Sequence, residues 1–202
     1  MALTKILNLG MGNTDAQNNV MLGSSAGDSF SGTDAVGNVL LGKDAGTAIT
    51  SGDYNVAVGT FALDANTTAG NNIAIGASSL GANTTGAENV GIGGSALSSN
   101  TTASYNTGIG RQALHANTTG ERNTAVGYLA LYTNTTGNYN TGIGQNTLAS
   151  NTTGSQNTAV GQTALDANTT AHNNTALGYA ALGANTTGTE NTALGANALG
   201  SN

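Results

Sequence analysis

Aliphatic and small residues return in this chain at a fixed interval of 17 residues. The recurring unit is a pentapeptide of Asn, then Thr, Val or Ile, then Ala or Gly, then Val, Ile or Leu, and finally Gly. A looser version begins at Asn38, and regular versions begin at Asn55, Asn72, Asn89, Asn106, Asn123, Asn140, Asn157, Asn174 and Asn191. A short fixed period indicates one structural unit stacked on copies of itself, so we expect a solenoid.

The repeat divides the chain into three parts. Counting each coil from its Asn as position 1, the consensus is Asn-Thr-Ala-Val-Gly-x-x-Ala-Leu-x-Ala-Asn-Thr-Thr-Gly-x-x. We expect a lead or cap segment over 1–18, atypical first coils over 19–54, and regular coils over 55–202, the last of them partial. In the atypical coils Gly27 and Gly46 replace the Leu, and the Asn-Thr-Thr corner is missing. The terminal repeats of a solenoid usually depart from the consensus, because they cap its ends.

The pattern within one coil predicts β structure. Positions 2 to 4 are often β-branched and predict a short strand, and positions 7 to 10 predict a second strand or extended segment. A pair of helices needs about 30 residues, which a 17-residue unit does not supply. The predicted fold is all-β, a parallel β-solenoid (β-roll) of 17-residue coils with two strands each.

Two positions predict interior ladders, and a third predicts a corner. Position 4 is always aliphatic: Leu41, Val58, Ile75, Ile92, Ile109, Val126, Ile143, Val160, Leu177 and Leu194. Position 9 is Leu in the regular coils: Leu63, Leu80, Leu97, Leu114, Leu131, Leu148, Leu165 and Leu182. Position 5 is Gly throughout, which predicts a corner with positive φ or with no room for a side chain: Gly59, Gly76, Gly93, Gly110, Gly127, Gly144, Gly161, Gly178 and Gly195.

Position 3 suggests how chains associate. It is Ala or Gly in every coil from Asn55 onward, and it should point away from positions 2 and 4. The interior of one coil is thin, and a stripe of tiny side chains allows another chain to approach closely. We therefore expect a homo-oligomer, with a trimer as the leading arrangement.

Charge and composition exclude several classes of function. The net charge is −6, and the four basic residues are Lys5, Lys43, Arg111 and Arg122, so there is no basic stripe for nucleic acid. The chain contains no run of roughly 20 apolar residues, so we do not expect it to insert into a membrane. Cys is absent, which leaves no thiolate metal site. The N-terminal segment lacks the features of a signal peptide, so we expect that the protein does not leave the cell by that route.

Candidate catalytic residues are scattered. His115 and His172 occupy different coil positions. Asp64 and Asp166 share position 10, but six coils apart; Glu88 and Glu190 share position 17 at the same separation, too far for a carboxylate pair. The Gly- and Asp-rich nonapeptide of calcium-binding β-rolls is missing. We expect a non-enzyme with no cofactor and no metal.

The Asn-Thr-Thr corner admits three interpretations. Each copy is formally a glycosylation acceptor, at Asn66, Asn83, Asn100, Asn117, Asn134, Asn151, Asn168 and Asn185. Eight copies in register are better explained as a structural corner with stacked Asn amides and Thr hydroxyls bonded to backbone. Rows of Thr at positions 13 and 14, and at position 2 from Thr107 to Thr192, also suit an ice-binding face.

Aromatic residues are few and predict either surface packing or a receptor contact. Tyr128 and Tyr179 share position 6, and Tyr132 and Tyr139 lie close to Tyr128 in sequence. Exposed aromatics often serve sugar-binding clefts, whereas scattered Tyr side chains on a rod more often pack on its surface. The expected partners of the chain are therefore other copies of itself and a host-surface receptor that these tyrosines would contact.

The repeat resembles a known family pattern. Segments such as Asn55-Val-Ala-Val-Gly59, Asn72-Ile-Ala-Ile-Gly76 and Asn123-Thr-Ala-Val-Gly127 resemble the head repeats of trimeric autotransporter adhesins, and similar repeats occur in bacteriophage tail-fibre proteins. The resemblance covers about residues 19–202 and implies left-handed rolls, with three chains around one axis. The coil here is longer than in the adhesins, and neither a signal peptide nor a membrane anchor is evident, which favours a phage.

The sequence thus predicts a shaft or host-facing adhesin segment of a trimeric fibre. Its expected location is the virion, as a tail fibre, or another extracellular surface. Eleven turns spaced about 4.8 Å apart give a rod of roughly 50 Å. Two alternatives stay open: an ice-binding solenoid that uses the Thr rows, and a self-polymerising extracellular filament.

Overall fold

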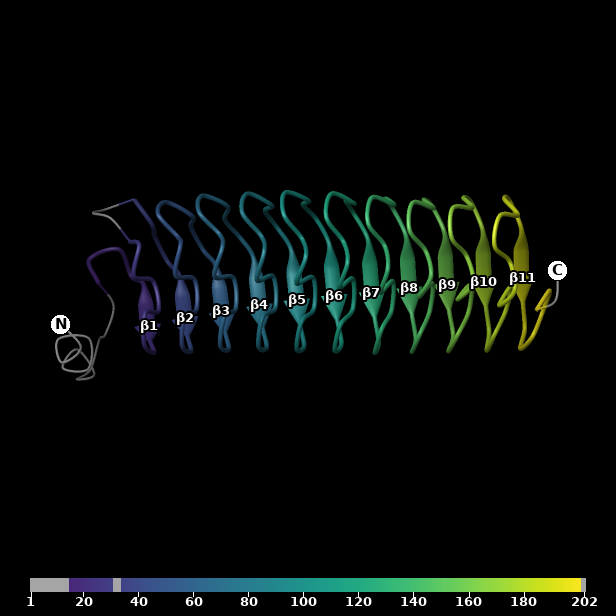
Figure 1. Ribbon diagram of the computed structural model, residues 1–202, viewed down its shortest axis with the longest axis horizontal. Helices are drawn as coiled ribbons and strands as arrows, with labels where there is room; N and C mark the ends of the chain where they lie inside the picture. The colour runs from purple at the N-terminus through teal and green to yellow at the C-terminus, as the bar shows by residue number, and fades with distance from the viewer. Residues whose placement is uncertain (1–14, 31–33, 201–202) are drawn as a thin grey trace.

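The chain forms an elongated rod of stacked coils with one sheet along its length (Figure 1). The computed structural model describes residues 15–30 and 34–200, and these contain strands and turns but no helix. Adjacent strands are parallel and in register, so that Val56 pairs with Ile73 and Val58 with Ile75. The eleven strands follow one another in chain order: β1 (Val20–Leu22), β2 (Val39–Leu41), β3 (Val56–Val58), β4 (Ile73–Ile75), β5 (Val90–Ile92), β6 (Thr107–Ile109), β7 (Thr124–Val126), β8 (Thr141–Ile143), β9 (Thr158–Val160), β10 (Thr175–Leu177) and β11 (Thr192–Leu194).

Positions 6 to 11 form turns, so the prediction of a second strand in each coil is wrong. In the coil of β3, the Ala62 amide donates to the Gly59 carbonyl at 3.3 Å, and the Asn66 amide donates to the Leu63 carbonyl at 3.3 Å. Phe61 and Leu63 have φ of 57° and 54°, which is left-handed and incompatible with an extended strand. The turns still bind the next coil, because the Leu63 amide donates to the Ser79 carbonyl at 3.0 Å.

The interior of each coil is built from position 9 and position 3. The position-9 leucines from Leu63 to Leu182 have no exposed surface, and the Ala or Gly of position 3 is buried opposite them. A Cβ on Gly108 at position 3 would lie 3.3 Å from Leu97 Cγ. The small side chain at position 3 therefore leaves room for Leu within the coil, and the expected role of position 3 as the face between chains is wrong.

Position 4 points out of the coil, which corrects the predicted interior ladder there. Side chains alternate along a strand, so position 3 inside places positions 2 and 4 outside. Every position-4 residue is half-buried or exposed, and Ile109 and Leu194 are 38% and 75% exposed. The residues that do not form the interior are Leu41, Val58, Ile75, Ile92, Ile109, Val126, Ile143, Val160, Leu177 and Leu194.

The corner glycines of position 5 stack directly on one another. Their φ values lie between 119° and 144° from Gly23 to Gly195, a region that other residues rarely adopt. A Cβ on Gly59 would lie 2.7 Å from the carbonyl carbon and oxygen of Gly76 in the next coil. Both the backbone angle and the lack of space therefore require glycine at this corner.

Two ladders of buried asparagine hold successive coils together. At position 1, the Asn72 amide N–H donates to Asn55 Oδ1 at 3.0 Å. At position 12, Asn83 Nδ2 donates to Asn66 Oδ1 at 3.2 Å. Both ladders also reach position 15, where Asn55 Nδ2 and Asn66 Nδ2 each donate to the Ala69 carbonyl at 2.9 Å. Every coil boundary in the regular region thus contains satisfied polar groups, as burial requires.

The first two coils fill the same interior with different residues. In the coil of β2, Leu40 at position 3 and Ile49 at position 12 are buried, and Gly46 stands where later coils have Leu. A Cβ on Gly46 would lie 2.8 Å from Leu40 Cδ2 and 2.9 Å from Ile49 Cδ1. The large side chains therefore stand at positions 3 and 12 in this coil, instead of at position 9, and the interior of the coil is still filled. Within the described residues no helix is long and apolar enough to cross a bilayer.

Candidate interaction surfaces of the rod

The asparagines of the eight Asn-Thr-Thr corners are inaccessible to glycosylation in the folded chain. Seven of them have no exposed surface, and Asn185 is 4% exposed. The Asn117 side chain, for example, donates to Asn100 Oδ1 at 2.9 Å and to the Gly120 carbonyl at 2.9 Å. A glycan on Nδ2 would break this ladder. The corner therefore has the structural role that eight copies in register suggested.

The candidate catalytic residues stay apart in the structure. His115 Nδ1 lies 2.8 Å from Ser98 Oγ, and its ring stacks on Tyr132 with centroids 5.2 Å apart. His172 Nδ1 accepts the Ser155 amide at 2.9 Å. No three His, Cys, Asp or Glu side chains in residues 15–30 and 34–200 are grouped so that they could hold a metal ion.

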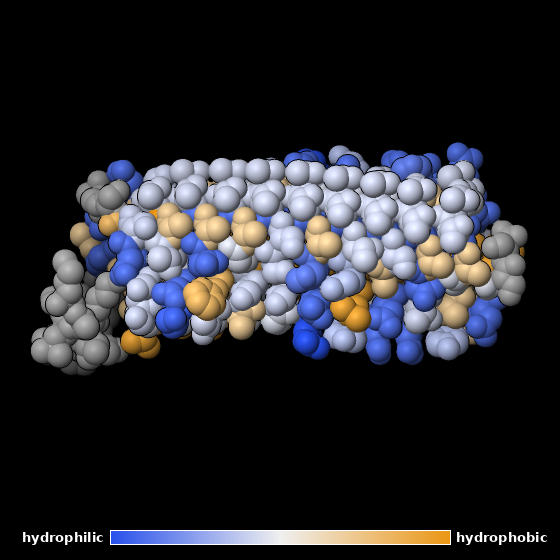
Figure 2. Space-filling model, in the orientation of Figure 1, coloured by the Kyte–Doolittle hydropathy of each residue, from blue (hydrophilic) through white to orange (hydrophobic). Residues whose placement is uncertain are grey.

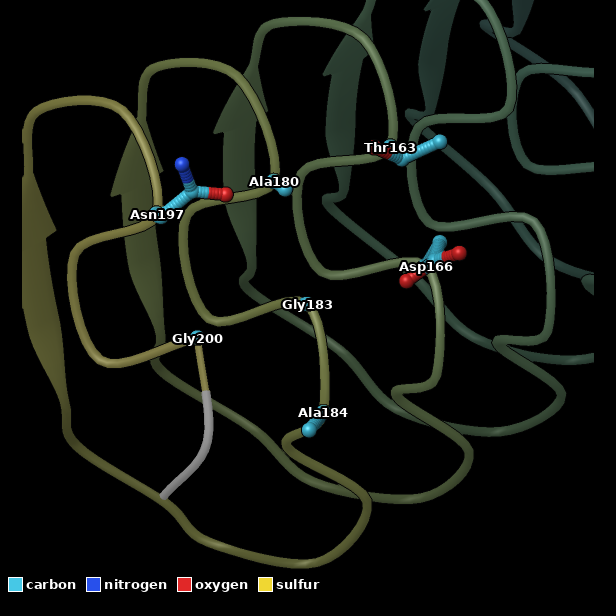
Figure 3. Close-up of a pocket in the computed structure, with 7 residues that line it drawn as sticks. All are labelled: Thr163, Asp166, Ala180, Gly183, Ala184, Asn197 and Gly200. Carbon is cyan, nitrogen blue, oxygen red and sulfur yellow. The ribbon is translucent and has the colours of Figure 1, made fainter.

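A shallow cleft near the C-terminal coils contains one carboxylate (Figure 3). Its volume is about 520 Å³, and it is lined by Thr163, Asp166, Ala180, Gly183, Ala184, Asn197 and Gly200. Burial raises the pKa of Asp166, and it also raises the pKa of Asp64, the residue six coils earlier. Asp166 is the only titratable group in the lining, so the cleft offers a general acid or base no partner.

The outer side of the sheet is a continuous uncharged surface, which we call the sheet face and define as the side chains at positions 2 and 4 of β1–β11. Position 4 is aliphatic in all eleven strands, and exposure is marked at Ile75, Ile109, Ile143 and Leu177. Eleven strands about 4.8 Å apart and about 10 Å long give roughly 500 Å² of sheet, along which position 4 forms one continuous aliphatic row.

Side chains of greater chemical variety gather on the coils of β5–β7. Residues 105–139 contain both arginines and four of the six tyrosines of the chain. At position 17 of three successive coils, Tyr105, Arg122 and Tyr139 form what we call the aromatic column. The Arg122 guanidinium lies 4.8 Å from the Tyr105 ring centre and 5.7 Å from that of Tyr139, and it pairs with Glu121 at 3.1 Å.

The aromatic column is exposed and sits on an unfavourable backbone. Tyr105 and Tyr139 are 47% and 56% exposed, so burial does not explain them. Tyr105, Arg122 and Tyr139 have φ of 64°, 57° and 57°, where Asn or Gly is easier to accommodate. Position 17 has a left-handed φ in every coil from Tyr54 to Glu190, so the exposed rings and guanidinium, and not the backbone angle, distinguish the column. The interval of 17 residues between Tyr105, Arg122 and Tyr139 could have predicted this column from the sequence. The tyrosines were instead predicted to be scattered over the rod.

The two Thr rows of the corner differ in availability. Hydroxyls at position 13 bind backbone, as Thr84 Oγ1 does to the Thr101 carbonyl at 3.0 Å. At position 14, all eight threonines from Thr68 to Thr187 are exposed. The face of the rod in Figure 2 likewise carries long rows of pale, weakly polar residues with only scattered hydrophobic ones. Position 14 is the Thr row that remains open to solvent.

Comparison of the chain with protein-family profiles, with curated proteins and with solved structures finds no match.

Proposed function

We propose that this chain is the rod-like segment of a homotrimeric fibre, in which the sheet faces of three copies pack around a common axis. The observation that carries the proposal is the unbroken aliphatic row at position 4 along all eleven strands. Each regular coil buries one Leu beside Ala, Gly and Asn side chains, so burial of a second apolar row between chains adds the stabilisation that a narrow roll lacks. The likeness to adhesin heads and tail fibres supports three chains and a place on a virion or another extracellular surface.

The native mass and one pair of variants test this proposal. We expect light scattering to give about three times the chain mass of 19.7 kDa. Ile109→Asp places a charge on the sheet face and should yield monomers, because burying an unpaired carboxylate is costly. Thr119→Asp, at the exposed position 14 of the same coil, should leave the trimer intact. A wild-type monomer would contradict the proposal, and an open-ended series of masses would favour the filament.

The aromatic column supports a host-facing role for the same rod. Its ring edges, hydroxyls and guanidinium are presented together on three coils, a combination that suits hydroxylated and planar ligand groups. Immobilised neutral and acidic oligosaccharides would serve as the probe. A Tyr105→Ala, Arg122→Ala, Tyr139→Ala variant should lose binding that the wild type shows. If the wild type binds none of them, the rod is a shaft only.

Ice binding is the second candidate, favoured by the open row at position 14. These eight side chains are all exposed, and a regular row of hydroxyls on a rigid rod can order water. Thermal hysteresis and ice-crystal shaping at high protein concentration test it directly. Thr102→Val and Thr136→Lys in one chain should reduce both effects, and no activity in the wild type would remove this candidate.

A further inference from the structure

The polarity of the sheet face changes abruptly between β5 and β6. Position 2 is Val or Ile in β1–β5 and Thr in β6–β11, without exception. Position 4 stays aliphatic on both sides of this boundary. The change therefore lies in one row only, between Val90 and Thr107, and we call it the polarity step.

A bundle of copies of this chain faces a problem of axial register. The coils are nearly alike, and the sheet face carries no charge, so the position-4 rows of two copies still meet when one copy slides by a coil. Register is weakly specified wherever the pattern on a packed face repeats. A feature that occurs once along the row penalises every shifted alignment beyond the loss of overlap at the two ends.

We propose that the polarity step fixes the axial register between copies of the chain, an inference that rests on the proposed fibre. In register, Val and Ile layers meet their equivalents, and Thr layers meet Thr, whose hydroxyls can bond across the interface. A slip of one coil places Thr107 of one copy in the layer of Val90 of another. Its hydroxyl is then buried without a partner, enough to bias the alignment about tenfold.

A second copy of this chain is the occupant that the sheet face fits. The face has no charged residue to pair with a partner of opposite sign, and each copy has the step at the same height. Only a parallel copy in register matches apolar with apolar and Thr with Thr over all eleven strands. A single polar position that specifies register in an otherwise apolar seam has a precedent in coiled coils.

Distances between spin labels in the oligomer test the inference. The chain has no Cys, so Thr136→Cys creates a unique labelling site at position 14. We expect one narrow distance in the otherwise wild-type rod. Changing all six position-2 threonines to Val removes the step: Thr107, Thr124, Thr141, Thr158, Thr175 and Thr192. That variant should keep the oligomer but add longer distances, from axial offsets in multiples of about 4.8 Å.

A matched control keeps the step and moves it. Val90→Thr shifts the boundary by one coil, so the single narrow distance should persist. Circular dichroism should report unchanged structure in both variants. An oligomer with one distance after the step is removed would overturn this inference and leave the fibre proposal standing. A wild-type monomer would overturn both.

Discussion

At the scale of single residues, side-chain burial outweighs backbone preference in this chain. Leu131 has φ of 52°, a left-handed angle that costs roughly 1–2 kcal/mol for a residue with a Cβ. Its side chain is fully buried, which contributes about 1.5–3 kcal/mol. Gly27 and Gly46 occupy the same position in the first coils with φ of 61° and 57°, free of this penalty. There the bulk comes from other positions instead.

The corner glycines lead to the first prediction. Gly127→Ala places a Cβ 2.5 Å from the Gly144 carbonyl oxygen at φ of 137°, and it should lower the free energy of unfolding by about 3 kcal/mol or more. Gly94 has open space around it and no positive φ, so Gly94→Ala should leave stability unchanged or raise it by about 0.4–1 kcal/mol. Urea unfolding of the two variants measures the contrast, and equal effects would contradict the stacked corner.

Asp166 gives a prediction about pH. Burial raises its pKa above the ordinary 3.8 in the folded chain, so the folded state holds this proton more tightly than the unfolded state. The group therefore favours folding only at low pH, and that contribution is lost as pH rises through the folded pKa. At pH 7, Asp166→Asn should raise the free energy of unfolding by about 0.5 kcal/mol or less, and with it the melting temperature. At pH 3 the melting temperature should change little. A lower melting temperature at pH 7 would contradict the assignment.

At the scale of the coil, the asparagine ladders decide which polar groups can be buried. Asn117→Ala removes a donor from Asn100 Oδ1 and the Gly120 carbonyl, and an acceptor from Asn134 Nδ2. Each orphaned group costs about 1–3 kcal/mol, so we expect a loss of about 3 kcal/mol or more in thermal or urea unfolding. Thr119→Ala in the same corner should change stability by less than about 0.5 kcal/mol. An Asn117→Ala variant of unchanged stability would mean that water satisfies the hydrogen-bonding groups that the Asn117 side chain leaves behind.

The exchange of bulk between coils supplies a double-mutant test. Gly46→Leu alone should destabilise by about 1–3 kcal/mol, because the new side chain meets Leu40 and Ile49. Adding Leu40→Ala recreates the pairing of Ala57 with Leu63 and should recover much of the loss. Coupling energies of about 0.5–3 kcal/mol are expected for residues in contact. Strictly additive effects would show that the two positions do not share one cavity.

At the scale of the whole molecule, the rod offers an uncharged face with a continuous aliphatic row for association. The proposed oligomer should therefore persist when NaCl is raised to about 1 M, because screening acts on charge pairs and not on apolar contact. Sulfate should strengthen it by favouring burial. Sedimentation at low and high salt measures this. Dissociation by NaCl would indicate that charged edges, and not the sheet face, join the chains.

The period of the sequence was sufficient to predict the parallel solenoid and its coil length, since both follow from the spacing of Asn and Gly. The direction of each side chain was harder. Ile109 and Leu114 are both aliphatic and both strictly periodic, yet one points outward and the other inward. The Leu114 side chain points inward because the turns around it are left-handed. Leu normally avoids such a φ, so the residue type does not predict it. A three-residue strand is also too short for alternation to indicate its inner side.

The position-12 ladder has one more consequence, because all of its amides point the same way. Asn83 Nδ2 donates to Asn66 Oδ1 in the preceding coil, and this direction is kept up to Asn185 and Asn168. Aligned amide dipoles add along a row, as peptide dipoles do in a helix. The position-12 ladder is therefore directional, with its positive end toward β3 and its negative end toward β11. Two such ladders placed end to end attract each other head to tail and repel each other head to head.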